Sequence, residues 1–535
     1  MEFPHPVEEP VARSSPGKLS GVYIQVADGT KLAVDVLLPR AIEGRKFTTV
    51  LIMTRYWRGV VGGGLSRWQT FFAKHGFAVV QGDVRGTGAS FGQWPHHRSR
   101  AETLDFTDIM DWVVSQPWSD GRIVGTGTSY LANTADWMAE RQHRALEVVI
   151  SRFADYDPYA DLYFPGGVPN AYMGEKWGQM VKDLDLNIRR EANGDLSPGV
   201  RPVDEDEGSK MLQAALKEHS SVPSVWEGLQ QVTCRDDGPE LWDNVSLTDF
   251  GICSHMDRVR QSGVSMQNWA GWMDAGTASG SIHRFRALPD SVHVVIGPWN
   301  HAGSHVFDPM NPEVSQVEPS YSQQQVENLV FIQQSLAGSW KGGQKRLSYY
   351  TCGEGKWKTT TIWPLPTTRF EDWFLGSQGT LSETSVDTGM DTYKVDYGVG
   401  TGEANRWATN KTMLAVSYGD RSEIDKRLLC YTSSPLPSDV EITGHPILTL
   451  FLASSEHDGA VFAYLELVST EGKVIYLTEG QLRLIHRRVS VDSQVYPQVS
   501  PYHSFLRKDA MPMVPGERVE IAFALHPISR AIVSA

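Results

Sequence analysis

The chain has 535 residues, which is more than one hydrophobic core usually supports, so we expect two or three domains. Its 49 basic and 63 acidic residues give a net charge of −14, and no long run of Lys or Arg occurs, which argues against a nucleic-acid partner. No stretch approaches the length of an apolar membrane span, and the opening MEFPHPVEEP lacks the pattern of a signal peptide. We therefore expect a cytoplasmic protein with no membrane partner.

Residues 48–153 alternate short apolar runs with helical patterns. DFTDIMDWVVSQ places Phe106, Ile109, Met110 and Val113 on one helical face. The runs rich in Val and Ile are typical of strands buried on both faces of a parallel sheet: TTVLIMTRY, GFAVVQGDV, GRIVGTG and LEVVISRF. This alternation predicts a doubly wound α/β domain.

The pattern changes twice further along the chain. Aromatic-rich helical pieces such as EKWGQMVKDL and KMLQAALKEH follow, and strands then return with GVSMQNWAGW and SVHVVIGPW. Near the end, the strand-like runs HPILTLFLASS, AVFAYLELVS and RVEIAFAL predict an all-β sandwich or jelly roll. The expected division is an α/β core over 1–154, a helical cap insertion over 155–255, the second part of the core over 256–340 and a β domain over 341–535.

The four cysteines, Cys234, Cys253, Cys352 and Cys430, are far apart and form no C-x-x-C motif. They are typical of reduced structural thiols, and we expect no zinc site. The tripeptide N-x-[ST] occurs at Asn244 and Asn410, but without a secretion signal it carries no weight.

The stretch GTGTSYLA (125–132) is a glycine-dense turn between a predicted strand and a predicted helix. It lacks the lysine of a Walker A loop, and Tyr130 occupies the third glycine position of a dinucleotide fingerprint. A sharp strand–turn–helix instead suits an exposed nucleophile, with small Gly127 before Ser129 and small Ala132 after it. Because Leu131 occupies the last glycine position of G-x-S-x-G, an ordinary serine in a βα turn stays open as the alternative.

A nucleophilic serine needs a base, and the base needs an orienting carboxylate. NWAGWMDAG and VVIGPWNHAG follow apolar strands and offer Asp274 and His301, in the order that this kind of turn requires. His293 lies in mid-strand, and His255 suits a cap position. His301 and His305 form a poor metal pair, since Gly303 separates them and no Glu completes H-E-x-x-H.

These stretches resemble the serine hydrolases of the cocaine esterase and Xaa-Pro dipeptidyl-peptidase superfamily (CocE/NonD hydrolases). The matching segments are DVRGTGASFG, QPWSDGRIVGTGTSYLA, GWMDAG, GPWNHAG, YYTCGEGKWKTTTIWP, SSPLPSDVEITG and TEGQLRLIHR. The resemblance implies an α/β-hydrolase core with a helical cap and a β jelly-roll domain. It also implies Ser129 as nucleophile, Asp274 as acid and His301 as base, with the Tyr56 hydroxyl and the Tyr130 N–H forming the oxyanion hole.

Three departures from the family pattern stand out. Arg55 occupies the place of the proline often found before the tyrosine, and bulky Trp57 follows Tyr56. Family members usually continue beyond ISRAI, so we expect either a shorter last domain here or a truncated sequence.

The function that follows is hydrolysis of a small-molecule ester or amide through an acyl-enzyme, with neither a metal nor an organic cofactor. A carboxylic ester hydrolase is the first hypothesis, an Xaa-Pro dipeptidyl-peptidase or acyl-amide hydrolase the second, and a non-catalytic carbohydrate-binding or scaffold protein the third. We expect Phe153, Tyr156, Trp177 and Trp226 to contact the substrate. The oligomeric state stays open, a homodimer included.

Overall fold

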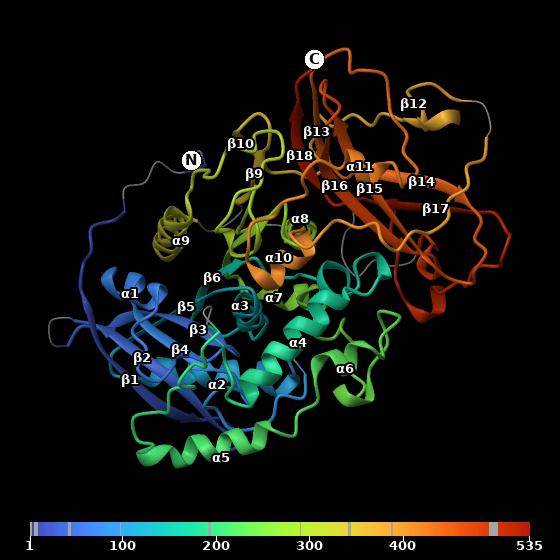
Figure 1. Cartoon of the computed structure of the whole chain (residues 1–535). Helices are drawn as coiled ribbons and strands as arrows, with labels where there is room; N and C mark the ends of the chain where they lie inside the picture. The colour runs from blue at the N-terminus through green and yellow to red at the C-terminus, as the bar shows by residue number, and fades with distance from the viewer. Residues whose placement is uncertain are drawn as a thin grey trace.

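The computed structural model shows one large mixed sheet covered by helices, with a β-rich region at the C-terminal end (Figure 1). The structure describes residues 3–4, 9–40, 44–96, 98–190, 194–288, 290–340, 344–386, 389–491 and 501–534.

The sheet has ten strands in the order β1-β2-β4-β3-β5-β6-β7-β8-β9-β10. Neighbours from β4 through β9 are parallel, whereas β1, β2 and β10 pair antiparallel at the two edges. The strands are β1 Pro16–Gln25, β2 Lys31–Pro39, β3 Phe47–Thr54, β4 Ala78–Asp83, β5 Ser119–Thr128, β6 Leu146–Arg152, β7 Ser265–Gly271, β8 Val292–Gly297, β9 Lys345–Thr351 and β10 Lys356–Thr360. The predicted doubly wound sheet is confirmed.

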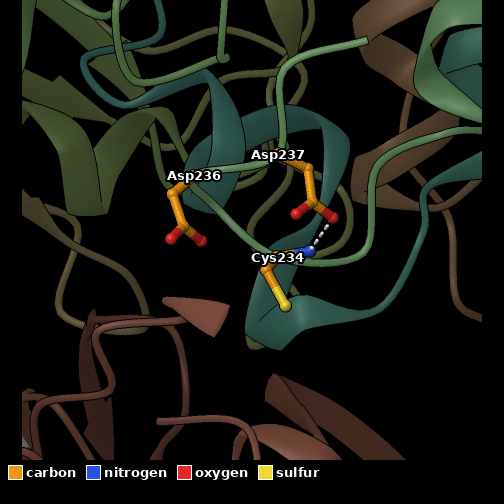
Figure 2. Close-up of side chains that lie close together, drawn as sticks. All are labelled: Cys234, Asp236 and Asp237. Carbon is orange, nitrogen blue, oxygen red and sulfur yellow. Dashed lines mark hydrogen bonds between the residues drawn. The ribbon is translucent and has the colours of Figure 1, made fainter. Parts of the chain in front are cut away.

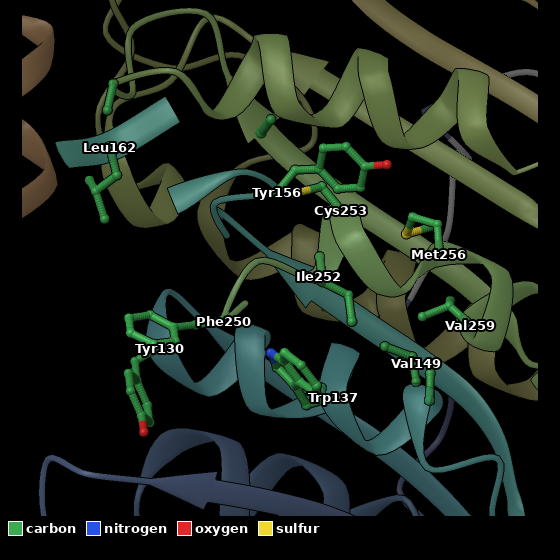
Figure 3. Close-up of a cluster of buried hydrophobic side chains, with 14 of the residues drawn as sticks. Tyr130, Trp137, Val149, Tyr156, Leu162, Phe250, Ile252, Cys253, Met256 and Val259 are labelled. Atoms are coloured by element: carbon green, nitrogen blue, oxygen red, sulfur yellow. The ribbon is translucent and has the colours of Figure 1, made fainter. Parts of the chain in front are cut away.

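Helices cover both faces of this sheet. Alternate strand residues point to opposite faces, so Val50 packs in the cluster with α1 and α9 while Leu51 packs in the cluster with α2, α3 and α8. The helices of the core are α1 Arg67–Lys74, α2 Arg100–Ser115, α3 Tyr130–Glu140, α7 Met256–Ser262, α8 Thr277–Ala287 and α9 Tyr321–Leu336. Figure 3 shows part of the second cluster, where Trp137 of α3 and Val149 of β6 gather with Ile252.

A helical insertion separates β6 from β7. Its helices are the π-helix η1 Pro158–Tyr163, α4 Ala171–Asp185, α5 Lys210–His219 and α6 Val225–Leu229. The short 3-10 turns of the chain are η2 Pro165–Gly167, η3 Glu207–Ser209, η4 Glu240–Trp242, η5 Ile252–His255, η6 His301–Gly303, η7 Ser377–Gly379, η8 Leu484–His486 and η9 Arg507–Asp509. Helix α4 lies beside the core sheet (Figure 1) and supplies one wall of the cavity described below.

The C-terminal region consists mainly of antiparallel strand pairs. They are β11 Phe374–Leu375 with β12 Leu381–Ser382, β13 Val440–Gly444 with β18 Ile528–Ile532, β14 Ile447–Leu452 with β17 Val519–Ala524, and β15 Ala460–Val468 with β16 Val474–Arg483. Two helices, α10 Arg406–Thr412 and α11 Ser422–Asp425, interrupt them. Figure 1 shows α10 away from the strand pairs, near the centre of the molecule, where it contacts α4.

The domain boundaries stay a proposal, and the structure suggests a later end for the α/β core. Strands β9 and β10 continue the core sheet beyond β8, because Val294 pairs with Leu347 in parallel register. We therefore propose that the α/β core extends to Thr360, beyond the predicted boundary at residue 340. Among the described residues, the helices all fall short of the length and apolar character that crossing a membrane requires.

Candidate active site

Ser129 lies on a strained turn between β5 and α3. Its backbone angles are φ 62° and ψ −129°, in a region that residues other than glycine rarely adopt. Gly127 is required there, because a Cβ at this position would lie 2.4 Å from the backbone carbon of Leu131. The turn tolerates Leu131 in place of a second glycine, and it lifts the Ser129 side chain clear of the strand.

Hydrogen-bond donors face the hydroxyl of Ser129. Tyr130 is the first residue of α3, so its N–H has no partner within the helix. The Tyr56 hydroxyl, after β3, accepts a hydrogen bond from Trp177 Nε1 at 2.9 Å. Burial raises the pKa of Tyr56, and hydrogen bonds with Trp177 and Ser129 partly oppose this effect. The phenol therefore stays protonated and can donate to a developing oxyanion.

Arg55 connects the tyrosine loop to the helical insertion. Its guanidinium forms a 2.6 Å ion pair with Asp185 of α4 and lies 4.1 Å from the ring centre of Trp94. The replacement of the family's proline by arginine thus fixes α4 against this loop. Trp57 has φ 69°, and the next residue, Arg58, donates from its N–H to Asp83 at 2.5 Å, which holds the turn in place.

Asp274 and His301 follow β7 and β8, and their strands approach closely. A Cβ at Gly271 would lie 2.1 Å from the Trp299 carbonyl, which explains the glycine in GWMDAG. His301 Nδ1 lies 2.9 Å from Asp274 Oδ1, and both side chains are buried. Because a carboxylate only accepts hydrogen bonds, we place the proton on Nδ1, which leaves Nε2 as an acceptor.

Four of the predicted site residues line one cavity: Ser129, His301, Tyr56 and Tyr130. Asp274 does not itself line this cavity and contacts it through His301. Among the described residues, nothing forms a hydrogen bond with His301 Nε2, although this atom is buried. The cavity therefore brings a serine hydroxyl and an imidazole acceptor together.

The four predicted substrate contacts divide into two pairs. Phe153 and Trp177 line the cavity. Tyr156 instead packs in the core beside Arg284, and Trp226 of α6 packs against Gly174 of α4. We therefore leave Tyr156 and Trp226 out of the candidate site.

Two acidic residues in the cavity wall were missed by the sequence analysis. Asp155 is paired with Arg98 at 2.9 Å and accepts from Asn133 at 3.0 Å, so its charge is compensated. Burial, followed by the neighbouring Asp157, raises the pKa of Asp161 well above its usual range, while its Oδ2 accepts from the N–H groups of Tyr156 and Asp157 at 3.1 and 2.9 Å. No sequence motif marks them, since their role depends on partners brought together by the fold.

Asn410 of α10 is another residue of the cavity wall, and the sequence analysis noted it only as part of an N-x-[ST] tripeptide. It is 9% exposed and lies beside Asp274. Its burial excludes a role as a surface glycosylation site in the folded protein.

A separate cluster of Cys234, Asp236 and Asp237 has ligand atoms within 4.8 Å of one another (Figure 2). Asp237 accepts from the N–H of Cys234 at 2.9 Å and pairs with Arg507, while Asp236 accepts from the Arg507 N–H at 2.8 Å. Burial raises the pKa of the Cys234 thiol, which disfavours the thiolate that a metal needs. We assign this cluster to a contact between the insertion and the C-terminal region.

Comparison with known proteins places this site in context. Residues 28–303 match the X-Pro dipeptidyl-peptidase (S15) family, and residues 339–532 match the X-Pro dipeptidyl-peptidase C-terminal non-catalytic domain. The chain is 34% identical over 558 residues to a protein assigned as a serine esterase from Mycobacterium bovis, covering 96% of this chain and 88% of that one. It is 27% identical over 513 residues to the cocaine esterase of a Rhodococcus species, covering 88% and 84%.

Comparison with solved structures gives a similar result. A crystal structure of a CocE/NonD family hydrolase from Staphylococcus aureus superimposes with a TM-score of 0.68 at 18% identity, covering 96% of this chain and 84% of that one. This likeness confirms the predicted fold class, an α/β-hydrolase core followed by a β-rich domain.

Proposed function

Since the chain belongs to the X-Pro dipeptidyl-peptidase (S15) family and is a serine hydrolase, we propose that it cleaves small-molecule carboxylic esters through a covalent acyl-enzyme. One observation carries the proposal. The Asp274–His301 hydrogen bond leaves an imidazole acceptor in the same cavity as Ser129, which lies on a strained turn.

In the proposed mechanism, His301 Nε2 takes the proton of Ser129 as the hydroxyl oxygen attacks the ester carbonyl carbon. The proton then passes to the alcohol as it leaves, and the acyl group remains on the serine oxygen. Water, activated by the same imidazole, attacks the acyl carbon and releases the acid. Asp274 holds the imidazole in the required tautomer throughout, and it stabilises the positive charge that forms on the ring.

The oxyanion formed in each step is proposed to accept two hydrogen bonds, from the Tyr56 hydroxyl and the Tyr130 N–H. Before the substrate binds, the Ser129 hydroxyl interacts with Tyr56, so we expect it to rotate toward Nε2 when a carbonyl oxygen takes its place. Trp177 supports this arrangement, because its N–H occupies one lone pair of the phenol oxygen and leaves the phenol proton free to donate.

The charges around the cavity favour esters of neutral acids over substrates with a free amino group. An ammonium group needs an unpaired carboxylate, whereas Asp155 is already paired with Arg98 and Asp161 Oδ2 already accepts from the N–H groups of Tyr156 and Asp157. Asp206 of the acidic loop 204–208 offers no alternative, because its carboxylate already accepts from the N–H groups of Met211 and Leu212 at 2.8 Å. The peptidase alternative, which the family name favours, thus requires a different binding mode.

The test is a panel of p-nitrophenyl acetate, butyrate and octanoate, with α-aminoacyl esters and Xaa-Pro anilides alongside. We expect kcat/KM to be higher for the three aryl esters than for the two amino-bearing classes. Preferred cleavage of Xaa-Pro anilides would establish the peptidase, and a chain inert to the panel and to a fluorophosphonate would support the non-catalytic alternative.

The three buried cysteines and the exposed Cys430 are all free thiols. We propose on this ground that the protein works in a reducing compartment such as the cytoplasm. Localisation of the tagged full-length chain tests this part of the proposal.

A further inference from the structure

Helix α10 reaches the active site from the C-terminal region. It carries Asn410, whose side-chain Nδ2 lies 3.1 Å from Asp274 Oδ1 and 3.3 Å from His301 Nδ1. The inference below rests on the proposed function, because it concerns the two residues proposed as acid and base.

The carboxylate of Asp274 is fully buried, and the donors around it in the described structure are the imidazole and neutral side chains. His301 Nδ1 lies 2.9 Å from Oδ1 and 3.0 Å from Oδ2, and Asn410 Nδ2 donates to Oδ1. The Thr277 hydroxyl lies 3.1 Å from Oδ2 and 2.9 Å from the Asp274 carbonyl oxygen, so its one proton serves either acceptor. In the described part of the chain, neither a Lys nor an Arg pairs with this carboxylate. A buried carboxylate without a cation depends on such donors to stay charged and to keep one orientation.

The proton positions decide what Asn410 does. An imidazole Nδ1 that donates to Asp274 cannot also accept from Asn410, so the amide donates to the carboxylate alone. The imidazole faces both oxygens of the carboxylate, and the Asn410 amide holds Oδ1, so it limits the rotation of the carboxylate that orients the ring.

Helix α10 is itself bound to both loops that carry these residues. The buried Arg406 donates from Nε and Nη2 to the Ala275 carbonyl at 2.9 and 2.7 Å, next to Asp274. On the other loop, Asn300 donates to the carbonyls of Met413 and Leu414 at 2.9 and 3.1 Å, directly after α10. The position of Asn410 is therefore fixed from both sides of the proposed acid–base pair.

We propose that Asn410 is a positioning residue for the Asp274–His301 pair, so that the C-terminal region completes the active site of the α/β core. Without this amide, the carboxylate loses one donor and the imidazole loses its fixed orientation toward Ser129. The effect should appear in kcat, because Asn410 acts on the base, and much less in KM.

The test compares Asn410→Ala with a matched control in the same helix, Asn405→Ala. Asn405 caps α10 by accepting from the N–H groups of Trp407 and Ala408, both at 2.9 Å, and the described structure gives it no contact with Asp274 or His301. We measure kcat and KM on p-nitrophenyl acetate, the rate of fluorophosphonate labelling and Tm. We expect Asn410→Ala to lower kcat and labelling 10- to 100-fold with KM within threefold, and Asn405→Ala to lower Tm with kcat within twofold.

A second variant, Asn410→Asp, keeps the shape of the side chain and serves if Asn410→Ala does not fold. A second carboxylate beside the imidazole favours the imidazolium, so the acid limb of the kcat/KM profile should move to higher pH. This shift reports how close position 410 lies to the imidazole, whereas the fall in kcat and labelling at constant KM in Asn410→Ala reports the positioning role.

The inference is overturned if Asn410→Ala matches Asn405→Ala in kcat, or if Asn410→Asp leaves the acid limb in place, while wild-type turnover still depends on Ser129. Turnover that persists in Ser129→Ala would instead overturn the proposed function, and this inference with it.

Discussion

The two sides of the proposed site are built in different ways. On the nucleophile side, Tyr56 and Ser129 follow neighbouring strands β3 and β5, and local backbone turns hold them. On the acid–base side, Asp274 and His301 follow β7 and β8, and their loops are bound by α10, which lies about a hundred residues further along the chain. A motif can encode the first side by itself, whereas the second side also needs the C-terminal region.

The largest effect should come from the nucleophile. We expect Ser129→Ala to lower kcat on p-nitrophenyl acetate by roughly 10⁴- to 10⁶-fold, because no other group can form the acyl-enzyme. The change removes one oxygen atom from a half-buried position, so Tm should stay near the wild-type value. A fluorophosphonate should label Ser129 in the wild type, and label on another residue would contradict the assignment.

The oxyanion hole should come next. We expect Tyr56→Phe to lower kcat by roughly 10²- to 10³-fold with little change in KM, since only the transition state loses a hydrogen bond. Trp177→Phe keeps the apolar wall and removes the donor that orients the phenol, so its effect should be smaller, about tenfold. A further loss when Trp177→Phe is added to Tyr56→Phe would contradict the view that Trp177 acts through Tyr56.

The turn itself can be tested with two glycines of one strand. At Gly127 a Cβ would clash with Leu131 at 2.4 Å, whereas at Gly125 its nearest neighbour, Met138 Sδ, lies at 3.4 Å. We therefore expect Gly127→Ala to cost about 2 kcal/mol or more of unfolding free energy and to reduce activity. The matched Gly125→Ala should change both far less. Similar losses in the two variants would mean that an added methyl group is harmful anywhere along this strand, and not only at the turn.

The smallest effect on activity is expected behind the nucleophile turn, where a titrating group affects stability. Glu102 accepts hydrogen bonds from the Tyr130 hydroxyl and from Trp94 Nε1, and burial raises its pKa from 4.5 to about 7. Between pH 4.5 and 7, the folded state thus holds a proton on Glu102 that the unfolded chain has released. This bound proton stabilises the folded state; its contribution is full below pH 4.5 and is lost as pH rises toward 7. The unfolding free energy lost over this range amounts to roughly 3 kcal/mol.

Replacing this carboxyl by an amide removes the titration and keeps the shape. We expect the unfolding free energy of Glu102→Gln to fall less between pH 4.5 and 7 than that of the wild type, as measured by urea denaturation. Parallel curves for the two proteins over this range would show that Glu102 does not titrate there.

The fold was largely predictable from patterns in the sequence. The apolar runs over 48–153 became β3 through β6, and the return of strands after the insertion became β7 and β8. The domain boundary near residue 340 stays a prediction, because YYTCGEGKW suits a strand in either domain. The strand pairing favours the core, since β9 pairs with β8, whereas the match to the C-terminal domain family begins at residue 339.

The predictions for the site varied in quality with the kind of signal. Ser129, Asp274 and His301 occupy strand ends, where a motif and its order in the chain are informative. The expected substrate contacts Tyr156 and Trp226 were chosen for aromatic character alone, and such residues pack a core as readily as they line a cavity. Asp155 and Asn410 had no signal that could have singled them out.

The sequence by itself determined the sheet, the strained turn at Ser129 and the order of the proposed triad, because strand period and glycine spacing act over a few residues. The tertiary structure alone decided which carboxylates around the cavity have a cationic partner and which amide holds Asp274. Those properties depend on burial and on partners such as Arg98 and Asn410, which folding brings in from distant parts of the chain.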